Sequence, residues 1–76
     1  MTVRDAFMTN FRRIFNDRVT KDADMDVTRF ARKAGVSKKN IYLWLNGDTT
    51  PTLVNAYRLA KALKCDVNDF LKGANE

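Results

Sequence analysis

The fold of this chain is decided by residues 26–47, which read DVTRFARKAGVSKKNIYLWLNG. A short turn, GVS at residues 35–37, separates two segments with helical spacing of apolar residues, 27–34 and 38–46. A three-residue turn is too short for the two helices to lie antiparallel, so they must cross steeply, with Val36 packed in the angle between them. The stretch therefore predicts a helix-turn-helix, a unit that presents its second helix to a groove.

The predicted helix 38–46 has an inner and an outer face. Ile41, Trp44 and Leu45 share the inner face, because residues three and four positions apart lie on one side of a helix. The outer face is left with Lys38, Lys39, Tyr42 and Leu43.

The first turn of this helix carries two lysines, which is locally unfavourable. The positive end of the helix dipole disfavours cations there by about 0.3–1 kcal/mol each. An approaching phosphate or guanine edge compensates for that cost, since lysine donates to guanine O6 and N7. Tyr42 is able to reach a phosphate or pack on a base edge, and Leu43 to meet a thymine methyl group. The alternative, that both lysines only solubilise the surface, stays open.

Contacts to DNA phosphates are expected beside this helix, because half or more of protein–DNA hydrogen bonds go to the backbone. The candidates are polar or basic residues of both helices and the following loop: Thr28, Arg29, Ser37, Asn46, Thr49 and Thr50. Arg32 and Lys33 are able to join them. Asn46 followed by Gly47 is equally well explained as a plain helix stop.

The net charge of the chain is concentrated in the same region. Residues 27–47 contain five basic side chains and no acidic one, whereas the rest of the chain has nine of each sign. The whole net charge of +5 therefore belongs to this stretch. A charge run is often only a solvated surface, but this one coincides with the predicted groove-binding helix and favours a nucleic-acid partner.

The whole sequence predicts an all-α protein with a single domain over residues 1–76. No stretch alternates apolar and polar residues as a half-buried strand would, and 76 residues hold only one small core. Helices are expected at about residues 3–18, 27–34, 38–46, 53–64 and 67–72. Their N-caps are expected at Thr2, Asp26, Ser37, Thr52 and Asp66.

Apolar side chains recur at helical spacing in each segment and predict its buried face. Besides the inner face of helix 38–46, the expected core is Phe7, Phe11, Ile14, Phe15, Phe30, Ala31, Ala34, Leu53, Ala56, Leu59, Ala60 and Leu63. Phe70 and Leu71 supply the apolar contacts of the last helix, and exposure of either would favour dimerisation.

Several classes of protein are disfavoured by what the sequence lacks. It has no histidine, no cysteine pair, no glycine-rich phosphate loop and no nucleophile beside a base, so we expect no enzyme, metal site or cofactor. Cys65 is the single cysteine, and its apolar neighbours favour a buried thiol over a reactive one. Without a membrane-length apolar run or a signal pattern, a cytoplasmic protein with no evident small-molecule substrate is expected.

The stretch from Met25 to Leu71 resembles the Cro/CI-type (XRE) helix-turn-helix family of phage repressors and bacterial regulators. The resemblance rests on the GVS turn, Ile41 and Trp44, the Asn-Gly stop, and LAKAL at residues 59–63. It implies a compact five-helix, lambda-repressor-like bundle that binds a double-stranded DNA operator, commonly as a homodimer on a two-fold symmetric site. At matching positions it implies base contacts by Lys38, Lys39, Tyr42 and Leu43, and a backbone contact by Asn46.

Three features depart from the family pattern. Val27 stands where many members carry a phosphate-binding Gln, so that contact is lost or taken over by Thr28 or Arg29. Phe15 and Leu45 stand at the sites of a common Arg–Glu pair between the first and third helices, so we expect a hydrophobic contact instead. The loop before Met25 is longer than is typical. Its acidic side chains are expected to face away from DNA: Asp22, Asp24 and Asp26.

Two kinds of function are consistent with these features. The first is a sequence-specific transcriptional regulator, acting as a repressor, of phage or bacterial origin. The alternative is an antitoxin or regulatory subunit whose main role is to hold a protein partner. The last helix and residues 72–76 are able to supply a surface for such a partner.

Overall fold

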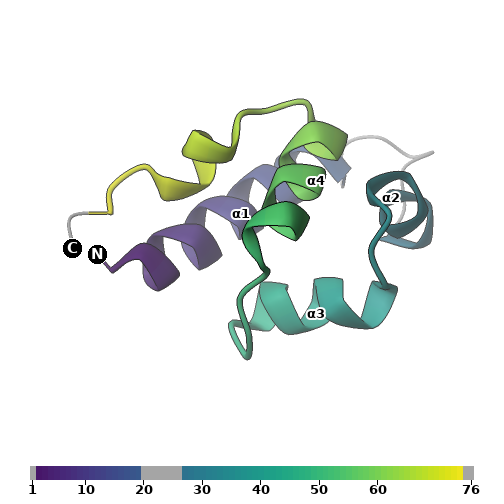
Figure 1. Cartoon of the computed structure of the whole chain (residues 1–76), viewed down its shortest axis with the longest axis horizontal. Helices are drawn as coiled ribbons and strands as arrows, with labels where there is room; N and C mark the ends of the chain where they lie inside the picture. The colour runs from purple at the N-terminus through teal and green to yellow at the C-terminus, as the bar shows by residue number, and fades with distance from the viewer. Residues whose placement is uncertain (1, 20–26, 75–76) are drawn as a thin grey trace.

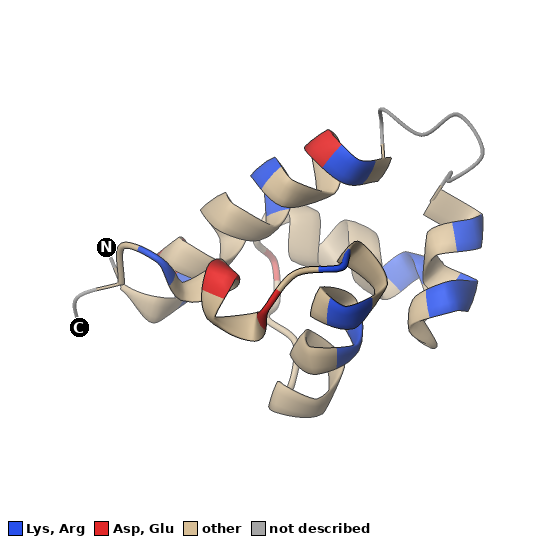
Figure 2. Cartoon of the chain, turned by 90° about the horizontal axis from the view of Figure 1, so that it is seen from above, with Lys and Arg blue, Asp and Glu red and all other residues tan. Residues whose placement is uncertain are grey.

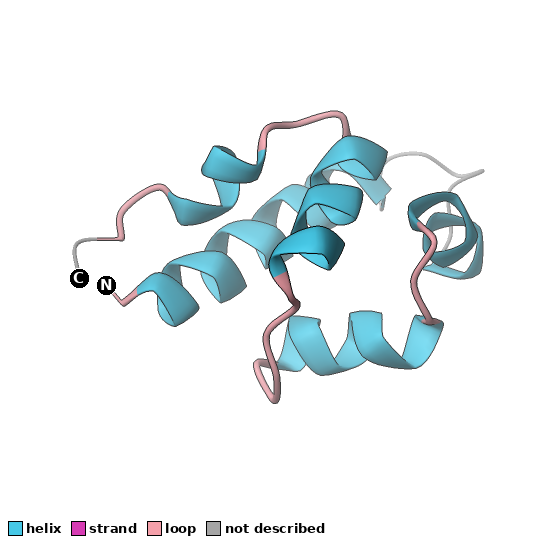
Figure 3. Cartoon of the chain, in the orientation of Figure 1, coloured by secondary structure: helices cyan, strands magenta, loops and turns pink. Residues whose placement is uncertain are grey.

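A computed structural model describes residues 2–19 and 27–74 of the chain. In chain order its elements are α1 (Val3–Val19), α2 (Val27–Ala34), α3 (Lys38–Asn46), α4 (Leu53–Leu63) and the 3₁₀ helix η1 (Val67–Leu71) (Figure 1). These described residues contain no strand, which confirms the all-α class (Figure 3). No described helix combines the length and the hydrophobicity that crossing a membrane requires.

The last predicted helix is not an α-helix. Residues 67–71 form a 3₁₀ helix, with the Asp69 N–H bonded to the Asp66 carbonyl at 2.8 Å, and Lys72 is extended. Five residues are too few to form a ladder of α-helical hydrogen bonds, and 3₁₀ geometry is common in such short pieces. The five-helix count is therefore not confirmed, because the described residues form four α-helices followed by η1.

Side-chain caps fix the starts of the helices. The N-caps predicted from the sequence are confirmed at Thr2, Ser37, Thr52 and Asp66. At η1 the cap is reciprocal, since the side chain of Asp69 also accepts from the N–H of the cap residue at 3.0 Å. Asp26, the cap predicted for α2, lies outside the described residues.

Five phenylalanines form the centre of the core. Phe7 stacks on Phe11 with ring centroids 5.3 Å apart, and Phe70 meets both rings edge-on at 5.4 and 5.7 Å. Phe15 meets Phe30 edge-on at 5.2 Å. Edge-to-face packing is favoured because the positive edge of one ring meets the negative face of the other. These contacts join α1, α2 and η1 in one core.

Two apolar residues expected to pack inward lie on the surface instead. Leu53 is 78% exposed and Leu71 is 37% exposed, while Ala56 and Leu45 are only half-buried. The apolar spacing of α4 continues into its first turn, but that turn borders an open groove rather than a packed neighbour. Periodicity identifies a face and does not show where the core ends. The other predicted core residues are buried.

Polar side chains of α1 bind carbonyl groups at the ends of other elements. Asn10, which is buried, donates its Nδ2 to the carbonyls of Phe70 and Lys72 at 3.0 and 2.8 Å. Arg18 donates its Nη1 to the Leu63 carbonyl at 2.9 Å. The last carbonyls of a helix have no partner within the helix, so α1 supplies partners for η1 and α4 as well as packing against them.

Candidate nucleic-acid interface

The turn between α2 and α3 is closed by backbone hydrogen bonds. The N–H groups of Gly35 and Val36 both bond to the Ala31 carbonyl, at 2.9 and 3.1 Å, and Gly35 has φ 75°. Glycine adopts this left-handed conformation without strain, whereas any other residue at this position would be strained. Val36 packs against the core, as predicted. In Figure 1 α2 is seen nearly end-on while α3 lies across the view, the steep crossing of a helix-turn-helix.

The inner face of α3 is fixed in the core. Ser37 Oγ accepts the Asn40 N–H at 3.1 Å and so defines the first turn. Ile41 is fully buried and Trp44 is 4% exposed, and half-buried Leu45 packs beside them on the core. The rotation of α3 about its axis is therefore set by its own apolar residues, which determines the side chains that point outward.

The four predicted base-contacting residues share the outer side of α3. Lys38, Lys39 and Tyr42 are exposed, and Leu43 is half-buried. Tyr42 is 45% exposed, which is high for a large aromatic side chain. Positions i, i+1, i+4 and i+5 lie side by side on a helix. We call these four residues the α3 strip; their contacts with bases are a proposal taken up below.

The predicted phosphate-contacting residues surround the α3 strip. They lie in the first turn of α2, at both ends of α3 and in the loop before α4, and all are exposed: Thr28, Arg29, Ser37, Asn46, Thr49 and Thr50. Ser37 Oγ accepts its capping hydrogen bond, which leaves the hydroxyl hydrogen to donate to a phosphate oxygen. Val27, where we expected a phosphate contact to be lost, packs against the core.

Basic side chains cover α2 and the start of α3. All of them are exposed: Arg29, Arg32, Lys33, Lys38 and Lys39. Figure 2 shows α2, at the right, with blue positions and no red one, whereas red positions appear at η1 and near the end of α1. A surface patch of one sign attracts a polyanion and raises its local concentration.

Two arginines of α1 bind the C-terminal end of α3, a role that sequence reasoning missed. Arg12 donates its Nε and Nη2 to the Leu45 carbonyl at 3.2 and 2.6 Å, and Arg4 donates its Nη2 to the Gly47 carbonyl at 2.8 Å. The sequence signal was weak: both arginines lie off the apolar stripe of α1, and every helix end has carbonyls that need donors. That signal does not identify which helix end they meet.

The contact expected at Phe15 and Leu45 is only part of the link between α1 and α3. Both side chains pack in the core cluster, consistent with an apolar environment at these sites. A polar link is nevertheless present, because Arg12 binds the backbone carbonyl of Leu45 in place of an acidic side chain. The expectation of a purely hydrophobic replacement was incomplete, and α1 still holds α3 through a guanidinium group.

The described residues were also searched for a metal site and for a reactive thiol. Among residues 2–19 and 27–74, no three His, Cys, Asp or Glu side chains are grouped so that they could hold a metal ion. Burial raises the pKa of the half-buried Cys65 thiol, and the carboxylate of Asp69 adds to the rise. The thiol is therefore protonated at neutral pH and weakly nucleophilic. The predicted burial holds only in part, because Cys65 is half-buried where it packs against the core.

Comparison with protein-family models matches residues 17–73 to the Cro/C1-type HTH DNA-binding domain. The chain belongs to this family. The matched region contains α2, α3, α4 and η1, and therefore both the helix-turn-helix and the basic surface. Searches of the curated proteins and of the solved structures give no match. Membership of a Cro/C1-type family supports a DNA-binding regulator.

Proposed function

We propose that this chain is a sequence-specific regulator of transcription that inserts α3 into the major groove of double-stranded DNA. The observation that carries the proposal is the α3 strip: two lysines and a tyrosine exposed on a short helix whose opposite side is locked in the core by Ile41 and Trp44. The major groove is about 12 Å wide and admits an α-helix, and its base edges differ for every base pair.

Each side chain of the α3 strip has a distinct part in this proposal. Lys38 and Lys39 lie at the N-terminal end of α3, the end that contacts base edges in helix-turn-helix proteins, and donate to guanine O6 and N7. Tyr42, one turn further on, reaches a phosphate or packs on a base edge. Leu43 is half-buried and offers its outer surface to a thymine methyl group.

Phosphate contacts flank the groove in this arrangement. Thr28 and Arg29 bind one side from the start of α2, with Ser37 beside them, while Asn46, Thr49 and Thr50 bind from the end of α3 and the following loop. These contacts fix the position of the domain without reading sequence. With Val27 turned inward, Arg29 and its basic neighbours on α2 supply the charge at the end of α2 where the family commonly uses Gln.

The proposed setting is a single DNA-binding domain acting as a homodimer on a two-fold symmetric operator. Two recognition helices on one face of the duplex double the number of bases read. A domain that occupies a promoter in this way acts as a repressor by excluding other proteins. The resemblance to phage repressors supports a phage or bacterial origin, and DNA as the partner supports a cytoplasmic location.

Selection of bound duplexes from a random pool tests the proposal. We expect recovery of a palindrome with half-sites about one helical turn apart. Recovery of random sequences at every salt concentration would contradict sequence-specific binding.

The Lys39→Ala substitution tests the role of the α3 strip. Loss of a base contact is expected to weaken binding to the selected duplex by about 1–3 kcal/mol and to leave binding to random duplex nearly unchanged. Equal losses on both duplexes would make Lys39 a phosphate contact instead. Titration of wild type and variant against both duplexes, at one salt concentration, gives the comparison.

The alternative function, a subunit that mainly holds another protein, is favoured by one observation. Leu53, Tyr57 and Leu71 give the surface around α4 and η1 an apolar character. An antitoxin-like role predicts that this surface binds a different protein in preference to a second copy of the chain.

A further inference from the structure

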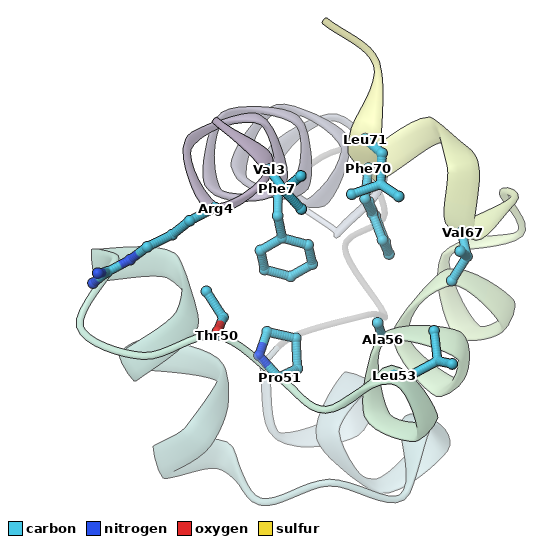
Figure 4. A pocket seen from close by; sticks show the side chains of 10 residues that line it. All are labelled: Val3, Arg4, Phe7, Thr50, Pro51, Leu53, Ala56, Val67, Phe70 and Leu71. Atoms are coloured by element: carbon cyan, nitrogen blue, oxygen red, sulfur yellow. The ribbon is translucent and has the colours of Figure 1, made fainter. Parts of the chain in front are cut away.

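Two hollows on the surface of the described residues differ in their chemistry. The groove in Figure 4 is apolar: Phe7 and Phe70 point into it, and Arg4 is the only charged residue among those that line it. The other, which we call the α2–α4 hollow, lies between the last turn of α2 and the second half of α4. It has a volume of about 430 Å³ and is lined by four basic residues and two alanines: Lys33, Ala34, Arg58, Lys61, Ala62 and Lys64.

The four basic side chains of the α2–α4 hollow have no protein partner. All four are exposed, and within residues 2–19 and 27–74 none of these side chains forms a hydrogen bond or an ion pair. Asp66 lines an adjoining hollow together with Lys61, but its carboxylate accepts the Asn68 N–H at 2.8 Å instead. Like charges gathered in this way repel one another and attract an anion.

The spacing of the charges along α4 suits a row of anions. Arg58, Lys61 and Lys64 follow one another at intervals of three residues and all line the hollow, so they span about 9 Å of the helix axis. One strand of DNA carries a phosphate charge about every 3.4 Å along its axis. The row therefore matches about three successive phosphates, and Lys33 adds a charge from α2. Neither helix carries an acidic residue (Figure 2).

The other lining residues favour a phosphate backbone over other anionic partners. Ala34 and Ala62 are buried and form the floor, and their methyl groups are too small to anchor a side chain of a peptide. No aromatic residue lines the hollow on which a base could stack, and no hydroxyl or amide side chain lines it that could read a base edge. Charge alone remains for recognition, as in sequence-independent binding to DNA.

The α2–α4 hollow lies away from the proposed groove contacts. Helix α4 begins beside the end of α3 and rises away from it in Figure 1. Lys64 follows Thr52 by twelve residues, so it lies about 18 Å further along the axis of α4. The duplex that holds α3 would have to bend sharply to reach this height, and DNA is stiff over about 50 nm. A second duplex reaches the hollow without such a bend.

We propose that the α2–α4 hollow binds the phosphate backbone of a second DNA duplex, so that one molecule holds two DNA segments. The inference rests on the proposed function, because the α3 strip holds the first duplex. Four phosphate contacts make a weak site by themselves. The site is occupied when the second segment is present at high local concentration, as for neighbouring stretches of one long DNA molecule.

Capture of one duplex by another tests the site. A duplex with the selected palindrome is immobilised, the full chain is added below the concentration of immobilised sites, and a fluorescent random duplex is supplied. We expect wild type to retain the fluorescent duplex. The double variant Arg58→Gln/Lys61→Gln is expected to retain about tenfold less or lower, because two phosphate contacts are lost.

The matched control is Arg13→Gln/Lys72→Gln, which removes the same charge from exposed positions outside the hollow and is expected to retain the fluorescent duplex. Circular dichroism verifies the fold of both variants, and binding to the immobilised duplex alone verifies equal loading. Equal capture by all three proteins, or an equal loss in both variants, overturns the proposal. Absence of capture by wild type also overturns it and leaves the hollow to an acidic protein segment.

Two further measurements separate the sources of phosphate and the two proposals. If longer flanks on the selected site strengthen binding of wild type but not of Arg58→Gln/Lys61→Gln, the hollow binds the same duplex, and its assignment to a second one is overturned. If wild type prefers no sequence, the proposed function fails. Affinities of the hollow variant and its control for random duplex then still decide the site, and equal affinities overturn it.

Discussion

Gly47 ends α3 with φ 81°, and its N–H bonds to carbonyls of the last turn of that helix. A Cβ added at this glycine would collide with the Sδ atom of Met8, which α1 places against it. Gly35 has a similar φ of 75°, but a Cβ there would meet no atom within 4 Å. The two glycines therefore share a backbone requirement and differ in the space around them.

Substitution of the two glycines separates these effects. We expect Gly35→Ala to cost about 1 kcal/mol of unfolding free energy, because only the left-handed conformation is strained. Gly47→Ala is expected to cost about 2 kcal/mol, since Met8 must also move. Denaturant unfolding of both variants measures the difference, and adding Met8→Ala should recover part of the loss at Gly47. Equal losses of unfolding free energy at the two positions would show that the Met8 side chain moves aside without an energetic penalty.

At the scale of elements, α1 supplies hydrogen-bond donors for the C-terminal ends of α3, α4 and η1. Arg12 holds the last turn of α3, Arg18 holds α4 and Asn10 holds η1, each by donating to backbone carbonyls. The Arg12 guanidinium makes two bonds to one carbonyl, so it restrains the position of that helix end as well as its hydrogen bonding. Helix α3 is thereby held at its start by Ser37 and at its end by α1.

Removal of the Arg12 side-chain donors tests this restraint. Arg12→Met keeps much of the aliphatic stem and is expected to lose about 0.5–1.5 kcal/mol of stability. Hydrogen exchange of the Gly47 and Asp48 amides, which bond within the last turn of α3, should accelerate. Arg13→Met, at the neighbouring exposed arginine, is the matched control. Similar effects of both substitutions would point to a general loss of charge on α1.

The capping box of η1 makes this element sensitive to acid. The backbone N–H of Asp66 and the ammonium group of Lys72 stabilise the ionised form of Asp69 and hold the pKa of its carboxyl below its ordinary value of about 4. A carboxyl whose pKa is lower when folded contributes stability above its unfolded pKa and loses it as the pH falls through the folded value.

The Asp69→Asn substitution isolates this contribution. We expect the variant to be less stable than wild type at neutral pH and the gap to narrow as the pH is lowered below about 4. Thermal unfolding at a series of pH values measures both trends. A gap that stays constant down to strongly acidic pH would show that ionisation of Asp69 contributes nothing.

At the scale of the whole molecule, the basic and the apolar surfaces occupy different elements. Basic side chains without acidic ones occupy α2 and the start of α3, while the surface around α4 and η1 exposes the apolar side chains of Leu53, Tyr57 and Leu71. Salt therefore acts chiefly on the basic surface. It screens the attraction of these basic side chains to phosphates.

We expect log K for DNA binding to fall linearly with log salt concentration, with a slope of about −0.9 for each phosphate neutralised. Arg29→Ala should reduce the size of that slope by about 1 and weaken binding to all duplexes alike. Lys72→Ala, which removes a charge at the end of η1, is the control and should leave the slope unchanged. Fluorescence anisotropy over a salt series measures these slopes. A wild-type binding constant that does not change with salt would argue against binding through contacts to phosphates.

Much of the local structure of this protein was determined by the sequence alone. The all-α class, the turn at residues 35–37, the caps at Ser37 and Thr52, and the outward strip of α3 were all predicted and are present in the structure. Each depends on groups within a few residues of one another: apolar spacing around a helix, a hydroxyl beside an unpaired N–H, or a glycine with positive φ. Such short-range preferences are readable without knowing which distant segments meet.

Other features were decided only by the tertiary structure. The same spacing rule that buries Ile41 and Leu59 also predicted a buried Leu53, which lies on the open edge of a groove. The attachment of Arg12 to the end of α3 joins residues 33 positions apart. Exposure and carbonyl partners depend on where separate helices come to lie. The sequence therefore determined which side of α3 faces outward, and the packing of α1, α4 and η1 decided how α3 is held and which apolar side chains stay exposed.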